Sequence, residues 1–120
     1  MNSSLQGSLA ETQAADYLVH KGHKLIARNF RAVGGEIDLV TLEDKTLVFV
    51  EVKQRASQAF GGPIAAVNAR KQKRIVQAAL QFIKMHKKPA YEEIRFDVIC
   101  ILPAEINHIE NAFFPPRMTI

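Results

Sequence analysis

Apolar residues recur at helical spacing in two parts of this 120-residue chain and form strand-like runs between and after them. Helical spacing over residues 9–21 and 69–87 predicts two helices. Gly22 is the expected end of the first helix, Asn68 the N-cap of the second, and Pro89 the stop beyond it. Apolar and β-branched runs predict strands over residues 24–30, 36–42, 46–53 and 94–102, and a short edge strand over residues 106–109.

The two central runs lack the alternation of apolar and polar residues that marks a sheet with one solvent-facing side. One expected face carries Ile37, Leu39, Val48, Val50 and Val52, and the other carries Val40, Leu42, Leu47 and Phe49. These strands should therefore be covered on both sides, by the helix that precedes them and the helix that follows. The order αβββαβ predicts a three-layer α/β sandwich with a central mixed β-sheet flanked by helices.

Length and composition are those of one globular domain, since 48% of the 120 residues are apolar and 23% are charged. We expect a single domain over residues 1–120, with a core over about 7–102 and a C-terminal segment over 103–120 that carries no recognisable motif. No apolar run is long enough for a membrane span, and we expect no secretion signal. The single cysteine, Cys100, fits a reducing compartment and predicts a cytoplasmic location.

Charged residues stand out within the predicted hairpin. If residues 44–45 form a two-residue loop, counting outward places Asp38 opposite Glu51 and Glu36 opposite Lys53. Directly opposed carboxylates destabilise a strand pair. Asp38 and Glu51 therefore require a neutralising lysine or a divalent cation between them.

Glu51 and Lys53 are two residues apart on a strand and point to the same face, which Asp38 shares in this register. Carboxylate oxygens suit Mg²⁺ or Mn²⁺, and such an ion can activate water and polarise a phosphodiester. Lys53 would then orient the attacking water or stabilise the transition-state charge. The competing interpretation is a cross-strand ion pair between Glu36 and Lys53, which would give this lysine a structural role.

Four segments carry a wider pattern: Gly34-Gly35-Glu36-Ile37-Asp38-Leu39-Val40, Phe49-Val50-Glu51-Val52-Lys53-Gln54-Arg55, Phe60-Gly61 and Arg95-Phe96-Asp97-Val98. Asp38 followed by Glu51-Val52-Lys53 resembles the PD-(D/E)xK motif of the restriction-endonuclease-like superfamily. Together the segments resemble the YraN family, small and largely uncharacterised bacterial proteins that are distantly similar to archaeal Holliday-junction resolvases. The resemblance covers about residues 7–102 and implies a restriction-endonuclease-like fold.

The resemblance also implies a role for Glu11, because resolvase-like nucleases often carry a glutamate in the first helix that completes the metal site. The sequence alone favours another role, since Ser8 and Glu11 have the spacing of a helix capping box. The resemblance favours a contact of Glu11 with the metal or its water.

Other polar residues have structural interpretations. Asp97, beside Arg95, is expected to be a buried partner of an arginine or a backbone group rather than a metal ligand. Gln54 and Arg55 follow the motif and either contact a phosphate or form a solvated strand end. The four histidines show no spacing typical of metal ligands, and we expect His20, His23, His86 and His108 at the surface.

The second predicted helix begins with the basic residues Arg70, Lys71, Lys73 and Arg74. The net charge is +4, and a cationic cluster of this kind suits a polyanionic partner, although a charge run is often only a solvated helix face. Contacts of lysine and arginine with phosphates give affinity without base reading. We therefore expect nucleic acid, with DNA favoured, to bind through its backbone.

These patterns predict a metal-dependent nuclease that acts on DNA phosphodiesters, including branched or junction DNA, with Mg²⁺ or Mn²⁺ as cofactor and no small-molecule cofactor. The alternative is a catalytically silent nucleic-acid-binding accessory protein of the same fold. A structural or protein-interaction domain would leave the opposed acids unexplained. Resolvase relatives work as symmetric dimers, so the resemblance implies a homodimer, with Phe113-Phe114 as a candidate exposed patch.

Overall fold

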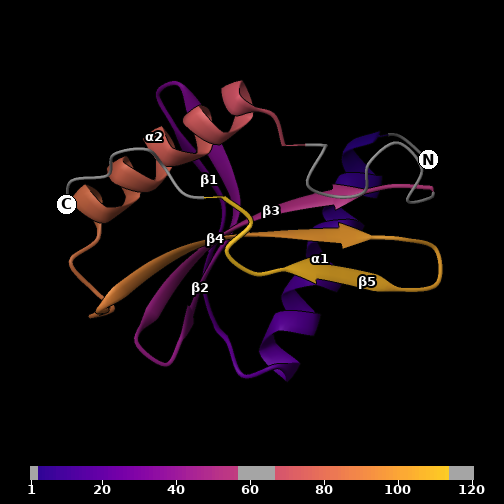
Figure 1. Ribbon diagram of the computed structural model, residues 1–120, viewed down its shortest axis with the longest axis horizontal. Coiled ribbons are helices and arrows are strands. Elements are labelled where there is room, and N and C mark those ends of the chain that lie inside the picture. Colours follow the sequence, from indigo (N-terminus) through magenta and orange to yellow (C-terminus); the bar gives the residue numbers. More distant parts are fainter. Residues whose placement is uncertain (1–2, 57–66, 114–120) are drawn as a thin grey trace.

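A computed structural model of the protein describes residues 3–56 and 67–113 (Figure 1). Its elements are α1 Ser3–His20, β1 Lys24–Ala32, β2 Gly35–Glu43, β3 Thr46–Gln54, α2 Ala69–Met85, β4 Glu93–Ile101 and β5 Ile106–Ile109. Each predicted helix and strand is present, and the largest difference is that α1 begins at Ser3 rather than at Leu9. The Phe60-Gly61 motif and Phe114 lie outside the described residues.

The strands form one mixed sheet in the order β1-β2-β3-β4-β5. Neighbouring strands are antiparallel except β3 and β4, which are parallel and joined by the crossover through α2. The two helices lie on opposite faces of this sheet, as Figure 1 shows. The predicted three-layer sandwich with a mixed sheet is therefore confirmed.

Each face of the sheet has its own apolar core. Helix α2 packs Ile75, Ala78, Ala79 and Phe82 against one face, together with Phe49 and Phe96. Helix α1 packs Ala10, Ala14, Ala15 and Leu18 against the other face. The alanines of α1 let the helix approach the sheet closely, and Val48 and Val50 lie beneath it.

The predicted faces of β2 were wrong at Ile37, which packs into the α2-side core although Leu39 packs into the α1-side core. Regular alternation would place residues two apart on one face. The switch occurs opposite Asn29 of β1, whose φ of 52° lies in the left-handed region. This turn of the backbone twists the strand pair, so that Arg28 pairs with Leu39 on one side of the switch and Phe30 with Ile37 on the other.

The hairpin register begins as predicted, with Glu43 paired with Thr46 across the two-residue loop. The ladder between β2 and β3 ends at the pair of Leu39 and Val50. Beyond this point β2 continues to pair with β1, where Glu36 lies opposite Arg31. The predicted Glu36–Lys53 pair was therefore wrong, because the β2–β3 ladder stops before it reaches these residues.

Helix α2 approaches the start of β2 very closely. A Cβ atom at Gly35 would collide with the carbonyl oxygen of Arg74, and Gly34 has a φ of 86°. Arg74 Nε also donates a hydrogen bond to the Gly34 carbonyl at 3.3 Å. The two glycines thus fix the first turns of α2 beside the strand that carries Asp38.

Across residues 3–56 and 67–113, none of the helices has the length and apolarity needed to cross a bilayer.

Candidate metal and nucleic-acid site

Asp38 and Glu51 lie on adjacent strands just beyond the last ladder pair. The backbone N–H of Val52 donates a hydrogen bond of 2.8 Å to Asp38 Oδ2, so the carboxylate takes the place of a backbone acceptor. The Glu51 side chain is only 5% exposed. The predicted pair of carboxylates thus lies just beyond the end of the hairpin ladder, close enough for Glu51 to raise the pKa of Asp38.

Two lysines neutralise Glu51. Lys53 Nζ lies 3.0 Å from Glu51 Oε1, and Lys71 Nζ lies 3.4 Å from the same oxygen. Lys53 comes from the same strand, whereas Lys71 comes from the first turn of α2. Glu36 is instead 3.8 Å from Arg31 and is exposed, so Lys53 belongs to the carboxylate site.

In this pair of carboxylates, Asp38 is the one whose pKa is clearly shifted. Burial and the nearby Glu51 carboxylate raise the pKa of Asp38 from 3.8 to about 7. The Val52 hydrogen bond and Lys71 oppose this rise, and Glu11 adds to it. A cation that approached Asp38 would therefore relieve an unfavourable charge interaction.

Glu11 does not form the capping box that its spacing with Ser8 predicted. Because α1 begins at Ser3, Glu11 lies within the helix, and the Ser8 carbonyl accepts a bond from Thr12 Oγ1 instead. The Glu11 carboxylate lies 3.8 Å from Arg28 Nη2 and contributes to the raised pKa of Asp38. Glu11 thus lies within electrostatic reach of Asp38 and has an arginine partner.

The donor set fits a hard divalent cation held by two carboxylates. In the described parts of the chain, no group of three histidine, cysteine, aspartate or glutamate side chains is arranged to hold a metal ion. Mg²⁺ needs no such cage, because it keeps several waters and binds through one or two carboxylates plus substrate phosphate. Asp38 and Glu51 supply this minimal set, whereas Glu11 could act only from farther away.

The basic start of α2 lies beside the carboxylates. Asn68 caps the helix, accepting a hydrogen bond of 2.9 Å from the Lys71 backbone N–H. Arg70, Lys73 and Arg74 are exposed, and the first turn contains no acidic residue. Cations at a helix N-terminus oppose the helix dipole, so this arrangement favours an anionic partner.

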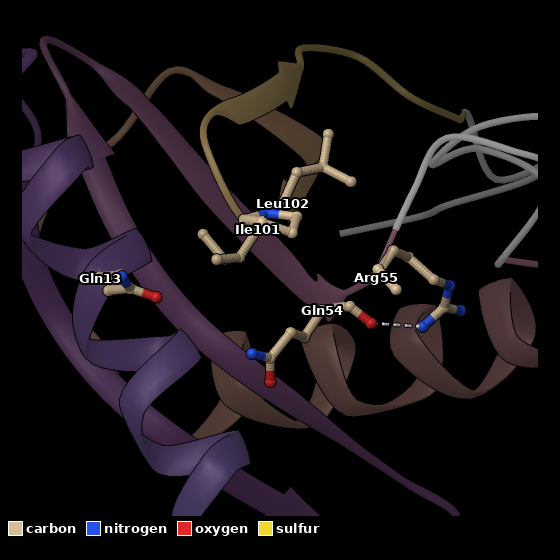
Figure 2. Close-up of a pocket in the computed structure, with 7 residues that line it drawn as sticks. Gln13, Gln54, Arg55, Ile101 and Leu102 are labelled. Carbon is tan, nitrogen blue, oxygen red and sulfur yellow. Dashed lines mark hydrogen bonds between the residues drawn. The ribbon is translucent and has the colours of Figure 1, made fainter.

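A pocket of about 580 Å³ lies where β3 and β4 end. Its lining includes Gln13 of α1 with Gln54, Arg55 and Leu102, and Figure 2 shows the two glutamine side chains on either side of the hollow. Arg55 Nη1 donates to the Gln54 carbonyl at 2.9 Å, and both residues are exposed. Gln54 and Arg55, the two residues predicted to contact a phosphate or to form a solvated strand end, are therefore exposed at the end of β3.

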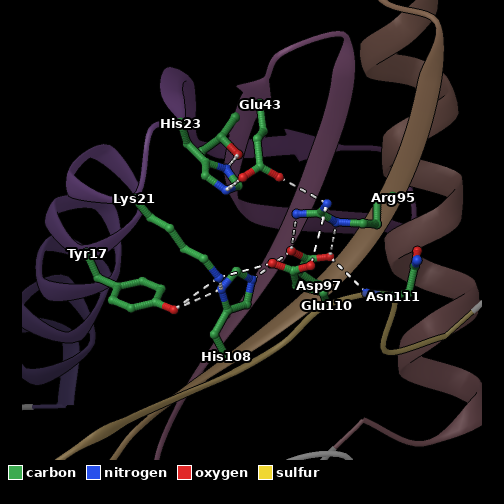
Figure 3. A network of polar contacts seen from close by, with 10 residues as sticks. Tyr17, Lys21, His23, Glu43, Arg95, Asp97, His108, Glu110 and Asn111 are labelled. Carbon is green, nitrogen blue, oxygen red and sulfur yellow. Dashed lines mark hydrogen bonds and ion pairs between the residues drawn. The ribbon is translucent and has the colours of Figure 1, made fainter.

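A second polar cluster lies on the α1 side of the sheet and centres on Asp97 (Figure 3). Arg95 donates two hydrogen bonds to Asp97, of 2.9 and 3.0 Å, so the expected buried partnership is present. His108 Nε2 lies 2.7 Å from Asp97 Oδ2, and the Asn111 N–H donates at 3.1 Å. Although burial opposes it, these bonds hold the pKa of Asp97 below its usual value.

The expectation of surface histidines was wrong for His23 and His108. His23 is 3% exposed and bonds to Thr41 Oγ1 at 2.8 Å, and the His108 side chain is also 3% exposed. Their partners come from distant segments, so local spacing gave no signal. Phe113 was likewise expected to be exposed, but it is buried and stacks on Phe96.

The contact of Lys71 with Glu51 was missed by sequence reasoning, which assigned Lys71 only to nucleic-acid binding. The available signal was its place in the first turn of a helix that follows the ExK strand through a glycine-rich loop. Only the placement of α2 against β2 shows which of the four cations turns inward.

The fold and the charged cluster define an α/β sandwich protein in which a half-buried and a buried carboxylate lie beside a basic helix. Residues 10–101 match the uncharacterised protein family UPF0102. A UPF0102 protein of Lachnoclostridium phytofermentans is 42% identical over 113 residues, covering 94% of this chain and 96% of that protein. The protein belongs to the UPF0102 family, which confirms the resemblance to YraN proteins.

Other relatives agree. A UPF0102 protein of Thermodesulfovibrio yellowstonii is 45% identical over 90% of this chain and 95% of its own length. One from Herminiimonas arsenicoxydans is 48% identical over 88% of this chain and 84% of its own length. Their names state no activity, so the chemistry has to be argued from the residues.

Proposed function

We propose that the protein is a metal-dependent nuclease that cleaves DNA phosphodiesters, with branched or junction DNA as the favoured substrate. The observation that carries the proposal is the pair of the half-buried Asp38 and the buried Glu51, with Lys53 Nζ 3.0 Å from Glu51 Oε1. A raised pKa of about 7 at Asp38 marks a carboxylate that is short of positive charge. Strongly shifted carboxylates beside a lysine are typical of functional sites.

Asp38 and Glu51 would hold Mg²⁺ or Mn²⁺, and Glu11 would support the ion through its water shell. The bound ion would supply a Lewis acid for the phosphate and lower the pKa of water. Lys53, the last residue but one of β3, would turn from Glu51 toward the attacking water or the phosphate oxygens. Its ammonium group would then stabilise negative charge in the transition state.

The basic residues would bind the nucleic-acid backbone. Arg70, Lys73 and Arg74 are exposed at the start of α2, and Arg55 is exposed at the end of β3. Lysine and arginine contacts with phosphates position a duplex without reading its bases. Recognition by backbone shape suits a branched substrate.

Symmetric cleavage of a junction requires two sites, so we infer a homodimer in the cytoplasm. The free and buried thiol of Cys100 is compatible with a reducing compartment. Light scattering with and without junction DNA tests the oligomeric state. A monomer under both conditions would limit the protein to one cut per binding event.

Cleavage assays test the nuclease proposal directly. Purified protein should cut branched DNA in Mg²⁺ or Mn²⁺, and Asp38→Asn and Lys53→Met should each abolish cutting. Asp16→Asn, an exposed aspartate of α1, is the matched control and should retain full activity. Cleavage that survives in the Asp38 or Lys53 variant would indicate a contaminating nuclease and defeat the proposal.

A silent nucleic-acid-binding protein is the second candidate. It is favoured by the two lysines on Glu51, which balance that carboxylate without any metal. This candidate predicts salt-sensitive DNA binding that Arg70→Glu with Lys73→Glu abolishes, and no cleavage of any substrate. Unchanged affinity after this charge reversal would exclude it.

A further inference from the structure

Lys71 differs from the other cations at the start of α2 because its side chain is turned toward the carboxylates. Its Nζ lies 3.4 Å from Glu51 Oε1, the oxygen that Lys53 Nζ contacts at 3.0 Å. Lys71 also lowers the pKa of Asp38. One ammonium group therefore acts on both carboxylates of the pair.

The position of Lys71 allows its charged group to move while its backbone stays fixed. The backbone N–H of Lys71 donates a hydrogen bond of 2.9 Å to the Asn68 side chain. Gly35 has no Cβ and packs directly against the Arg74 carbonyl, which fixes this part of α2 on β2. The Lys71 side chain is 34% exposed, so the ammonium can also reach solvent. Lys53 is 20% exposed and belongs to the strand that carries Glu51.

We propose that Lys71 is a metal-responsive lysine, which neutralises Glu51 while no metal is bound and turns to the DNA phosphate when the ion arrives. This inference rests on the proposed metal site. A divalent cation between Asp38 and Glu51 repels an ammonium group at the same place. The released lysine lies on the same helix turn as Arg70, Lys73 and Arg74, so it joins a phosphate-binding surface.

Two consequences follow for binding. Metal alone has to displace Lys71 and therefore binds less tightly than the two carboxylates would allow. DNA offers the displaced ammonium a new partner, so metal and DNA each strengthen the binding of the other. Lys71 thus links the metal site to substrate binding.

Calorimetry with Mn²⁺ alone tests the first consequence, at about pH 8.5 so that Asp38 is ionised. Lys71→Gln should bind Mn²⁺ about fivefold more tightly than the wild type, the size expected for loss of a partly exposed competing ion pair. Lys71→Arg, which keeps the charge, should stay within about twofold of wild type. Lys73→Gln, two residues away and exposed, is the matched control and should also stay within about twofold.

Binding of uncleaved junction DNA tests the second consequence, with Ca²⁺ in place of Mn²⁺ to prevent cutting. Lys73→Gln should weaken DNA binding equally with and without metal, whereas Lys71→Gln should weaken it mainly with metal. Equal or weaker Mn²⁺ binding by folded Lys71→Gln overturns the inference, as does an equal loss of DNA affinity in both conditions. If Lys71→Gln does not fold, Lys71→Met is measured in its place against the same outcomes.

The outcomes separate this inference from the proposed function. If wild type and Asp38→Asn give the same absence of Mn²⁺ binding, the metal site itself is wrong. If the wild type binds Mn²⁺ and Asp38→Asn does not, the site stands, and only the comparison of Lys71→Gln with Lys73→Gln decides the role of Lys71.

Discussion

Two aspartates of one sheet, the buried Asp97 and the half-buried Asp38, have pKa values shifted in opposite directions. Asp97 receives two bonds from Arg95, one contact from His108 and one bond from the Asn111 N–H, and its pKa is lowered. In the described residues, Asp38 receives a single bond from the Val52 N–H, and its pKa is raised to about 7.

The difference separates a structural carboxylate from one that is prepared for a ligand. A buried charge is tolerated when partners satisfy it, and Asp97 has enough donors for both of its oxygens. Asp38 lies close to a second carboxylate and has too few donors, which destabilises the folded protein. A site that retains such a conflict is a candidate for binding a cation.

Asp97→Asn should have the largest effect on stability. The substitution removes the fully buried carboxylate from its pair with the half-buried Arg95 guanidinium, and removal of one partner of a buried pair costs about 3–5 kcal/mol. Glu43 and Glu110 also lie near Arg95, so we expect a loss of about 3 kcal/mol in the free energy of unfolding. Urea unfolding measures it, and Asp16→Asn should change by less than about 0.5 kcal/mol. A loss below about 1 kcal/mol would show that Asp97 is not the structural carboxylate that its contrast with Asp38 requires.

Asp38→Asn should have the opposite sign and stabilise the protein by about 2 kcal/mol at about pH 8. The asparagine can still accept the Val52 N–H bond but carries no charge beside Glu51. Because the pKa of Asp38 rises from 3.8 to about 7, the folded state retains a proton that the unfolded state has lost between these values. The wild-type free energy of unfolding therefore falls as pH rises through this window.

The pH profile supplies the check on this second prediction. The gain from Asp38→Asn should vanish below about pH 4, where the aspartate is protonated in both states. A constant gain across the pH range would show that charge is not its cause, and a loss of stability at about pH 8 would contradict the description of Asp38 as under-neutralised.

The sequence predicted the architecture and part of the site. The two-residue loop at residues 44–45 fixes the hairpin register, so the sequence alone places Asp38 and Glu51 on neighbouring strands. The end of the β2–β3 ladder and the switch at Ile37 were missed; the switch lies opposite Asn29, whose left-handed backbone the pattern of apolar residues does not reveal. Asparagine tolerates this conformation better than most residues, so Asn29 carried a weak signal.

The sequence predicted the contact of Asp97 with Arg95 but not its contact with His108. Arg95 and Asp97 are two residues apart on one strand, and their contact follows from strand geometry. His23 and His108 were missed because their partners lie on other elements. The turn of Lys71 toward Glu51 was missed for the same reason, since it depends on how α2 packs on β2.

Gly35→Ala should disturb the Asp38 region and spare the Asp97 cluster. The added Cβ would meet the Arg74 carbonyl, so α2 must shift away from β2. Overpacking of this kind costs about 1–2 kcal/mol, and we also expect tighter Mn²⁺ binding, because the start of α2 carries the competing Lys71 away from the carboxylates. Val33→Ala, at an 87% exposed position in the same turn, should leave both quantities unchanged. If Gly35→Ala had the stability and Mn²⁺ affinity of the wild type, the close approach of α2 to β2 would not be needed for either.

Tyr17→Phe should have the smallest effect, a loss of about 0.5 kcal/mol. Hydrogen bonds from Lys21 to Glu110 and Tyr17 outweigh burial and raise the pKa of Lys21, so its ammonium can only donate to His108 Nδ1, at 3.1 Å. His108 then carries its proton on Nε2, where it donates to Asp97. The Tyr17 hydroxyl also lies 3.1 Å from Nδ1, and its loss leaves Lys21 in place to hold this tautomer.

The double variant Tyr17→Phe with Lys21→Met tests that redundancy. It should lose clearly more stability than the two single variants together, because nothing then donates to His108 Nδ1 and the tautomer is free to change. Additive losses would mean that the imidazole orientation is set by Asp97 alone. In that case Tyr17 and Lys21 would add nothing to the Asp97 cluster, and the contrast with Asp38 would rest on the bonds that Asp97 itself receives from Arg95, His108 and the Asn111 N–H.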